Sequence, residues 1–231
     1  MFRGKKYKEN ISKYDSSKEY SLDDALDLLC GFVKPNFDES VDISVNLGVD
    51  PRHADQLIRG AVSLPNGTGK KVRAVVVTKE DDKAEQCIKA GAVNAGSKDL
   101  LDKIQKGWLD FDVLIASPDM MPQLGKLGKV LGPRGLMPNP KVGTVTNEVV
   151  KCLDEVLAGK VEYRVDKNGI INVGVGKVSF DKDKLKENIL TCMNAILRAK
   201  PSSVKGTYFE KFTLTSTMGP GIKVSKSDFV N

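Results

Sequence analysis

The sequence predicts an α/β protein in which an α+β split domain with an antiparallel sheet carries an inserted Rossmann-like parallel α/β domain. Strands with antiparallel alternation lie near both ends of the chain, and strands alternate with helices at regular spacing between them. The economical arrangement is a discontinuous first domain of residues 1–67 and 160–231, interrupted by a second domain of residues 68–159. Periodicity alone leaves this split as one option among several.

The N-terminal part combines a basic segment, a helix and a strand. Cations and few apolar anchors in residues 1–18 are typical either of a solvated tail or of a basic arm that becomes ordered on RNA. Ser21 is a candidate N-cap for a helix that must end before Pro35. The alternation of residues 37–49 predicts a half-buried antiparallel strand.

The middle of the chain alternates strands with helices. Apolar residues 72–78 predict a parallel strand buried on both faces, and the following elements are expected at residues 83–90 (helix), near 93 (strand), 98–106 (helix) and 111–116 (strand). The GTGK sequence that ends at Lys70 lacks the spacing of a phosphate loop, and SPDMMPQLG is not a glycine-rich dinucleotide turn. No cofactor is therefore expected.

The last third of the chain is predicted to hold a helix, a hairpin, a long helix and a strand. Thr146 or Asn147 can cap a helix that ends at Gly159. Asn-Gly at residues 168–169 is a strong signal for a tight hairpin. The hairpin strands are expected at residues 161–165 and 170–175, the amphipathic helix from Asp181 onward, and the final strand at residues 208–217.

Composition favours a globular protein with a polyanionic partner. The 231 residues have a formal charge of +6, with 40% hydrophobic and 29% charged residues, and the pI is near 9.0. His53 has no ligand neighbours at metal spacing, so no metal site is expected. Scattered cysteines predict buried thiols in a reducing cytosol: Cys30, Cys87, Cys152 and Cys192. No apolar run approaches the roughly 20 residues of a membrane helix, so a cytoplasmic protein is expected.

Residues 124–145 form the least ordinary stretch of the chain. A short apolar helix with lysines leads into a loop punctuated by proline and glycine, which predicts a defined irregular surface loop. No acidic residue occurs between Asp119 and Glu148, although the stretch holds several cations. Unopposed cations on a rigid loop suit a polyanion, while a hinge or a connection between domains is the alternative.

The string GPRGLMPNPKVGTVT, residues 132–146, resembles the signature of the ribosomal protein L-one family of the large subunit, in its bacterial form. The resemblance covers nearly the whole chain and supports the split architecture. It implies that the two-terminus domain binds ribosomal RNA of the mobile side stalk and that the inserted domain swings towards exit-site tRNA. It further implies a translational repressor that binds its own operon's mRNA, located on the ribosome, monomeric when free, and not an enzyme.

The resemblance also implies which residues contact nucleic acid, because Thr217-Met218-Gly219 looks like the RNA-contact element of the family. A row of threonines is otherwise typical of a water-facing sheet, although hydroxyls on a rigid strand can bond ribose and phosphate groups. The expected RNA-binding residues are Phe37, Ser40, Lys167, Asn168, Thr213, Thr215, Thr217, Met218, Gly219 and Gly221. The expected tRNA-facing residues of the loop are Lys129, Arg134 and Lys141.

Several of these residues have a plainer alternative. Phe37, at the entrance of its strand, is also typical of a core plug, and Lys167 and Asn168 at the hairpin tip can be turn residues only. Gly219 and Gly221 are expected to let the backbone approach RNA closely. A nucleotide-dependent enzyme built on the inserted domain and a general architectural RNA binder are the rival functions.

Overall fold

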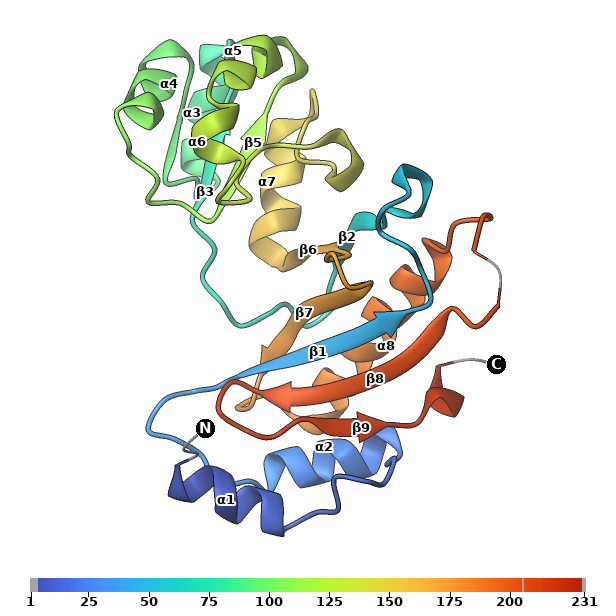
Figure 1. Ribbon diagram of the computed structural model, residues 1–231. Coiled ribbons are helices and arrows are strands. Elements are labelled where there is room, and N and C mark those ends of the chain that lie inside the picture. Colours follow the sequence, from blue (N-terminus) through green and yellow to red (C-terminus); the bar gives the residue numbers. More distant parts are fainter. Residues whose placement is uncertain (1–3, 205, 230–231) are drawn as a thin grey trace. The chain divides into compact units, whose positions relative to one another are not determined.

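The computed structural model describes residues 4–204 and 206–229 (Figure 1). The chain forms two compact units, of which the first consists of Met1–Gly69 and Val161–Asn231 and the second of Lys70–Lys160. The first unit contains a four-stranded antiparallel sheet, and the second contains a three-stranded parallel sheet with helices. The predicted α/β fold class is confirmed.

The four-stranded sheet of the first unit has the strand order β7-β1-β8-β9. Its strands are β1 (Ser40–Leu47), β7 (Ile170–Lys177), β8 (Phe209–Ser216) and β9 (Ile222–Val224). The predicted alternation of β1 is confirmed, since Val41, Ile43 and Val45 are fully buried and Asp42 and Ser44 lie on the half-buried opposite face. β9 lies where the sequence predicted no strand, because three residues are too few to show a period.

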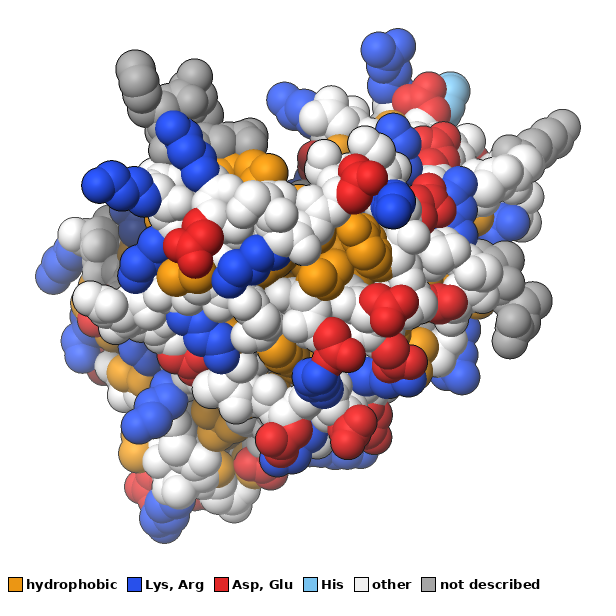
Figure 2. Space-filling view, turned by 90° about the horizontal axis from the view of Figure 1, so that it is seen from below, with side chains coloured by type: hydrophobic (Ala, Val, Ile, Leu, Met, Phe, Trp, Pro, Cys, Tyr) orange, Lys and Arg blue, Asp and Glu red, His pale blue; other side chains and the backbone are white. Residues whose placement is uncertain are grey.

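Two helices, α2 (Leu22–Cys30) and α8 (Lys182–Arg198), supply most of the apolar surface that covers the core side of this sheet (Figure 1). Ser21 is the N-cap of α2, as predicted, and its hydroxyl accepts a hydrogen bond from the Asp24 N–H at 3.2 Å. Ion pairs of Lys186 with Asp23 and of Lys182 with Asp27 join the two helices. On the face drawn in Figure 2, basic and acidic side chains are interspersed, so net charge alone does not mark a binding surface.

Asn188, a fully buried residue of α8, joins three separate segments of the first unit. Its side-chain amide donates to the Val175 carbonyl at 2.8 Å and to the Gly67 carbonyl at 2.9 Å. Its amide oxygen accepts from the Asn66 N–H at 3.1 Å. The chain is thereby fastened to α8 and β7 shortly before the second unit begins at Lys70.

The predicted hairpin of residues 161–165 and 170–175 is wrong as a pair of strands. β6 (Lys160–Arg164) pairs with β2 (Arg59–Ser63) in a separate two-stranded sheet, and its only contact with β7 among the described bridges is Val165 with Ile171. The tight turn itself exists, since Gly169 has φ +78°. Arg59 of β2 and Glu162 of β6 form an ion pair at 2.6 Å across this sheet, and the local sequence pattern could not reveal a pairing between residues so far apart in the chain.

Residues 5–12 form a helix, α1 (Lys5–Ser12), rather than the tail or arm that the composition suggested. Asn10 is buried and exchanges two hydrogen bonds with the backbone of Val33 at 2.7 and 3.2 Å. The rings of Tyr14 and Phe32 lie 5.8 Å apart behind it. Buried Asn10 therefore helps to anchor a segment whose composition is typical of a solvated chain. Residues 1–3 of the predicted tail lie outside the described residues.

The second unit is a parallel sheet with the order β4-β3-β5 and helices on both faces. Its strands are β3 (Ala74–Val77), β4 (Asn94–Gly96) and β5 (Val113–Ala116), and its helices are α3 (Asp81–Lys89), α4 (Lys98–Gln105), α5 (Met121–Lys126), α6 (Gly128–Leu131) and α7 (Val149–Ala158). Val75 and Val77 pack towards α4, α5 and α6, whereas Ala74 and Val76 pack towards α3 and α7. This two-sided burial explains the continuous apolar run.

Helix α7 begins slightly later than expected. Glu148 occupies the N-cap position, and the Thr146 hydroxyl accepts the Glu148 N–H at 3.1 Å instead of capping the helix directly. Gly159 ends the helix with φ 114°, as predicted. Short 3-10 helices occupy Ala54–Gln56, Pro118–Met120, Pro140–Val142 and Lys226–Asp228.

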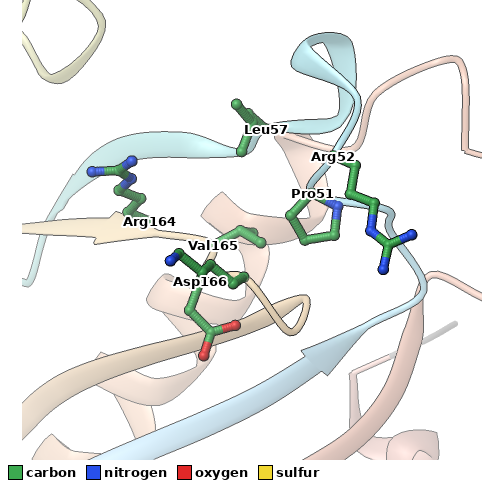
Figure 3. Close-up of a pocket in the computed structure, with 7 residues that line it drawn as sticks. Pro51, Arg52, Leu57, Arg164, Val165 and Asp166 are labelled. Atoms are coloured by element: carbon green, nitrogen blue, oxygen red, sulfur yellow. The ribbon is translucent and has the colours of Figure 1, made fainter.

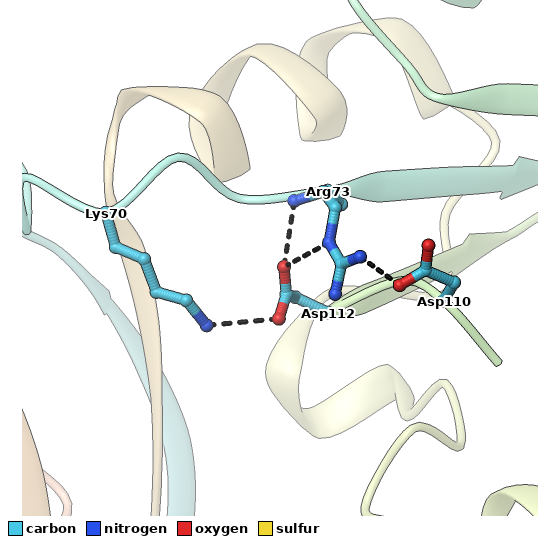
Figure 4. Close-up of polar contacts among 4 residues, drawn as sticks. All are labelled: Lys70, Arg73, Asp110 and Asp112. Atoms are coloured by element: carbon cyan, nitrogen blue, oxygen red, sulfur yellow. Dashed lines mark hydrogen bonds and ion pairs between the residues drawn. The ribbon is translucent and has the colours of Figure 1, made fainter.

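An ionic network fixes the segment through which the chain enters the second unit (Figure 4). Asp112 accepts from the Arg73 N–H at 3.1 Å, from the Arg73 guanidinium at 3.3 Å and from Lys70 at 3.0 Å. Arg73 also pairs with Asp110. Partial burial raises the pKa of Asp112, but the hydrogen bonds from Arg73 and Lys70 outweigh it and hold the pKa below its usual value.

Asp112→Asn is expected to lower the melting temperature at neutral pH, because the ionised carboxylate is stabilised by its donors. A depressed folded-state pKa means that this stabilisation is present above the unfolded value of about 3.9 and is lost as the pH falls through the lower folded value. Thermal melts of both proteins from pH 7 to pH 3 should therefore converge at the acid end. Asp154→Asn, at an exposed position of α7, is the control; a constant gap between wild type and Asp112→Asn at every pH would contradict the role of the charge.

Three of the four cysteines are buried as expected, but Cys30 is only half-buried at the end of α2. Burial raises the pKa of Cys192 to about 12, so this thiol stays protonated and unreactive at neutral pH. Among residues 4–204 and 206–229, no group of three or more histidine, cysteine or acidic side chains could hold a metal ion. None of the described helices has the length and apolar character needed to span a membrane.

Candidate nucleic-acid interface

The ends of β1 and β8 bring Ser40 and Thr217 together, although they are far apart in the chain. The Ser40 N–H donates to the Thr217 hydroxyl at 3.0 Å, and the Thr217 N–H donates to the Ser40 carbonyl at 3.1 Å. Met218 follows with 61% of its surface exposed. We name Ser40, Thr217 and Met218 the threonine–methionine cluster. One acceptor position of the Thr217 hydroxyl is thus occupied inside the protein.

Glu39 holds the backbone of this cluster in place. No pattern in the sequence indicated this role. Its side chain is almost completely buried, and its carboxyl oxygen accepts the Met218 N–H at 2.7 Å. The Lys177 ammonium donates to the Ser40 hydroxyl at 3.0 Å from the neighbouring strand. An acidic residue just before a strand carries no signal of such a role, because its partner lies 179 residues away.

Phe37 precedes the cluster and is 52% exposed, so the alternative of a core plug is wrong. Single exposed apolar side chains are ordinary, but Phe37 lies three residues before Ser40, and Met218 follows the partner of Ser40, so both belong to the same end of the sheet. Apolar and aromatic groups in such a place can stack on bases or sugars. Phe37 and Met218 therefore form the apolar part of the candidate interface.

Both glycines are needed for close packing within the protein, and their approach to RNA stays a prediction. A Cβ atom at Gly219 would lie 2.4 Å from the Ser216 hydroxyl oxygen, and one at Gly221 would lie 2.9 Å from the Thr213 methyl group. The turn from β8 to β9 needs both glycines to close tightly. The Thr215 hydroxyl lies 3.4 Å from the Gly219 carbonyl, to which it donates.

Thr213 and Thr215 lie on the half-buried face of the sheet, opposite the helices. Thr213 pairs with Ser44 in the adjacent strand, and Thr215 pairs with Asp42. Burial raises the pKa of Asp42, and the charge of Lys177 partly offsets this. The polar face is therefore a row of hydroxyls with one carboxylate, and the sequence search for cations and threonines missed Ser44 and Asp42.

Lys167 and Asn168 do not join the threonine–methionine cluster, contrary to the prediction that they complete one patch. Ser40 pairs with Lys177 at one end of β7, whereas the turn that holds Lys167 precedes Ile170 at the other end. The seven residues between these ends span roughly 23 Å of extended strand. Local sequence could not show this, because it does not specify which end of a strand faces which neighbour.

Helix α6 and the loop that follows it carry Lys129, Arg134 and Lys141, and all three side chains are exposed. Within the described residues, none of them forms an ion pair. The loop is held by Asn139, whose N–H donates to the Thr144 hydroxyl at 2.8 Å and whose side chain accepts the Lys141 N–H at 2.8 Å. The predicted rigid loop with unopposed cations is present in this unit.

One known protein family matches most of the chain. Residues 29–220 match the ribosomal protein L1p/L10e family. The chain belongs to this family. The matched range contains both strands that carry the threonine–methionine cluster and the whole second unit.

Membership of the ribosomal protein L1p/L10e family means that the chain is a non-enzymatic, rRNA-binding protein of the large ribosomal subunit. The rival of a nucleotide-dependent enzyme is therefore set aside on family grounds.

Proposed function

We propose that this chain, a bacterial-type member of the ribosomal protein L1p/L10e family, binds ribosomal RNA of the mobile side stalk through Phe37 and the threonine–methionine cluster. The observation that carries the proposal is Met218, which is 61% exposed although its own backbone is held by a buried glutamate. Because the backbone of Met218 is already held, RNA that covers its side chain meets only the rotamer entropy of that side chain, about 1.5–2 kcal/mol for methionine, and gains the burial of its apolar surface.

The hydroxyl groups add polar contacts to this apolar centre. Thr213 and Thr215 lie on the half-buried face of the sheet. The Thr217 hydroxyl accepts the Ser40 N–H and donates to the Ser40 carbonyl at 3.4 Å, which leaves the second of its two acceptor positions for an RNA donor such as a ribose hydroxyl. Hydroxyls on a paired strand can bond ribose 2′-OH and phosphate oxygens without ordering a long side chain. Gly219 and Gly221 contribute by letting the turn close, and thus by placing Met218.

The second unit has a separate proposed role. We infer that the loop with Lys129, Arg134 and Lys141 contacts exit-site tRNA and assists its release, because these cations are exposed on a braced backbone. Recognition of a similar RNA structure in the mRNA of the chain's own operon, with repression of its translation, rests on the family resemblance of residues 132–146. The free protein is proposed to be a monomer.

Met218→Ala is expected to weaken binding to a side-stalk rRNA fragment by about 1–2 kcal/mol, or roughly 5–30-fold, because it removes apolar surface that the RNA buries. A filter-binding titration against the stalk fragment and a scrambled RNA of equal length measures this. Leu197→Ala, at an exposed apolar position of α8, is the matched control and should bind like wild type.

Thr217→Val removes the hydroxyl, and with it both the proposed contact to RNA and the acceptor for the Ser40 N–H. It is expected to weaken binding in the same assay, and also to lower stability because the Ser40 N–H loses its acceptor. Equal affinity of wild type, Met218→Ala and Leu197→Ala would rule out the threonine–methionine cluster as the contact. Equal, salt-labile binding to stalk and scrambled RNA would reduce the protein to a general RNA binder.

A further inference from the structure

A groove in the first unit lies apart from the threonine–methionine cluster and is not explained by it (Figure 3). Its volume is about 750 Å³, and it is lined by Pro51, Arg52, Leu57, Arg164, Val165, Asp166 and Lys167. Figure 3 shows the side chains of Arg52 and Arg164 on opposite sides of Pro51 and Val165. We call it the basic groove. Its rim is cationic, and part of its lining is apolar.

The cations of the basic groove have no acidic partner within the described part of the chain. Arg52, Arg164 and Lys167 are exposed, and none of them forms an ion pair there. Three cations against one lining carboxylate, Asp166, give this hollow a local positive potential.

The acids near the groove are already engaged elsewhere. Glu162 pairs with Arg59 at 2.6 Å. Asp166 accepts the N–H groups of Asn168 and Ile170 at 2.8 and 2.9 Å and so serves the turn. Asp50 accepts the backbone N–H of Arg52 at 3.0 Å, which is not a contact with the guanidinium. These carboxylates shape the backbone and form no ion pair with the three cations within the described residues, although Asp166 keeps its negative charge in the lining of the groove.

The backbone that carries the cations is well defined. Arg164 ends strand β6, which pairs with β2, and Lys167 lies in the turn that Asp166 closes. Arg52 follows the turn capped by Asp50. The apolar lining includes Leu57, which is 44% exposed, beside the buried Val165. Cations on a well-ordered backbone, beside exposed apolar surface, suit a nucleic-acid strand, whose phosphates alternate with sugars and bases.

We propose that the basic groove is a second contact for the sugar-phosphate backbone of RNA, with Arg52 and Arg164 binding phosphates from two sides and Lys167 adding to the field. The inference rests on the proposed RNA-binding function. Because the groove and the threonine–methionine cluster lie at opposite ends of β7, one RNA that reaches both must run along the sheet. The cluster then supplies specific recognition, and the groove supplies phosphate contacts and orientation.

The test is the salt dependence of RNA binding by the full-length Arg52→Gln/Arg164→Gln variant. Each lost phosphate contact reduces the slope of log affinity against log salt by roughly 0.7–0.9, so the double variant should lose roughly 1.5. Its affinity at moderate salt should fall roughly tenfold for both the stalk fragment and the scrambled RNA. Arg198→Gln/Lys226→Gln removes the same charge at exposed positions of the same unit and is the control.

The outcomes separate this inference from the proposed function. A reduced slope on both RNAs, beyond that of the control, supports the groove even if the stalk fragment is not preferred. If the double variant and the control have the same slope while Met218→Ala still weakens stalk binding, the groove is not a contact but the proposed function stands. Thermal melts of both double variants should match wild type, since none of the four mutated side chains forms an ion pair within the described residues.

Discussion

Asn188→Ala is expected to lower the free energy of unfolding by about 2–4 kcal/mol, because it removes three hydrogen bonds, one of them buried and two part-buried. The Val175 and Gly67 carbonyls lose a donor and the Asn66 N–H loses an acceptor. The space left in α8 adds a cavity cost. The melting temperature should fall by roughly 6–15 °C.

The position offers a close control within the same helix. Asn194 is exposed on α8, so Asn194→Ala should change stability by less than about 0.5 kcal/mol. Far-UV circular dichroism measures unfolding of the whole chain, while Trp108, the single tryptophan, reports on the second unit. Similar destabilisation by the two alanine substitutions would show that the buried hydrogen bonds of Asn188 contribute little.

Glu39→Ala is expected to weaken RNA binding about as much as Met218→Ala does, although Glu39 is buried. Without the carboxyl oxygen the Met218 N–H has no acceptor, so the turn that presents Met218 loses its anchor. Leaving a buried donor unpaired costs about 1–3 kcal/mol, so stability should fall together with affinity. Filter binding and thermal melts measure the two effects.

Glu39→Gln distinguishes a positioning role from a role of charge. Glutamine keeps a side-chain oxygen at the same place, so this variant should retain most of the affinity that alanine loses. Restored binding in Glu39→Gln identifies the hydrogen bond as the important feature. Wild-type affinity in Glu39→Ala, with Met218→Ala still weak, would instead show that the turn holds Met218 without Glu39.

The regular elements could be predicted because they are local. The period of two in residues 41–47 and the apolar run at residues 74–77 appear within a few positions, and both are buried as those patterns require. Helix α2 was equally predictable from the sequence, since its cap and its first turn occupy four consecutive residues. For such elements, the side-chain pattern and the backbone hydrogen bonds occupy the same short stretch.

The candidate interface was only partly predictable. The family resemblance predicts Thr217 and Met218 as RNA contacts because it includes their motif. It predicts Lys167 as well, but Lys167 lies at the other end of the sheet. Glu39 and Asn188 carried no sequence signal, because a buried polar residue is recognised only by its partners. The helix at residues 5–12 was missed for the same reason, since one buried side chain, Asn10, holds it.

The sequence by itself determined the fold class, the burial pattern of the strands and helices, and the family of this protein. Only the tertiary structure decided that β6 pairs with β2, that the two glycines pack against Ser216 and Thr213, and that Arg52 and Arg164 meet at one groove. The physical reason is the separation along the sequence between the residues that interact. Periodicity reports which face of an element avoids water, whereas register and partner choice depend on hydrogen bonds and ion pairs between residues up to 207 positions apart.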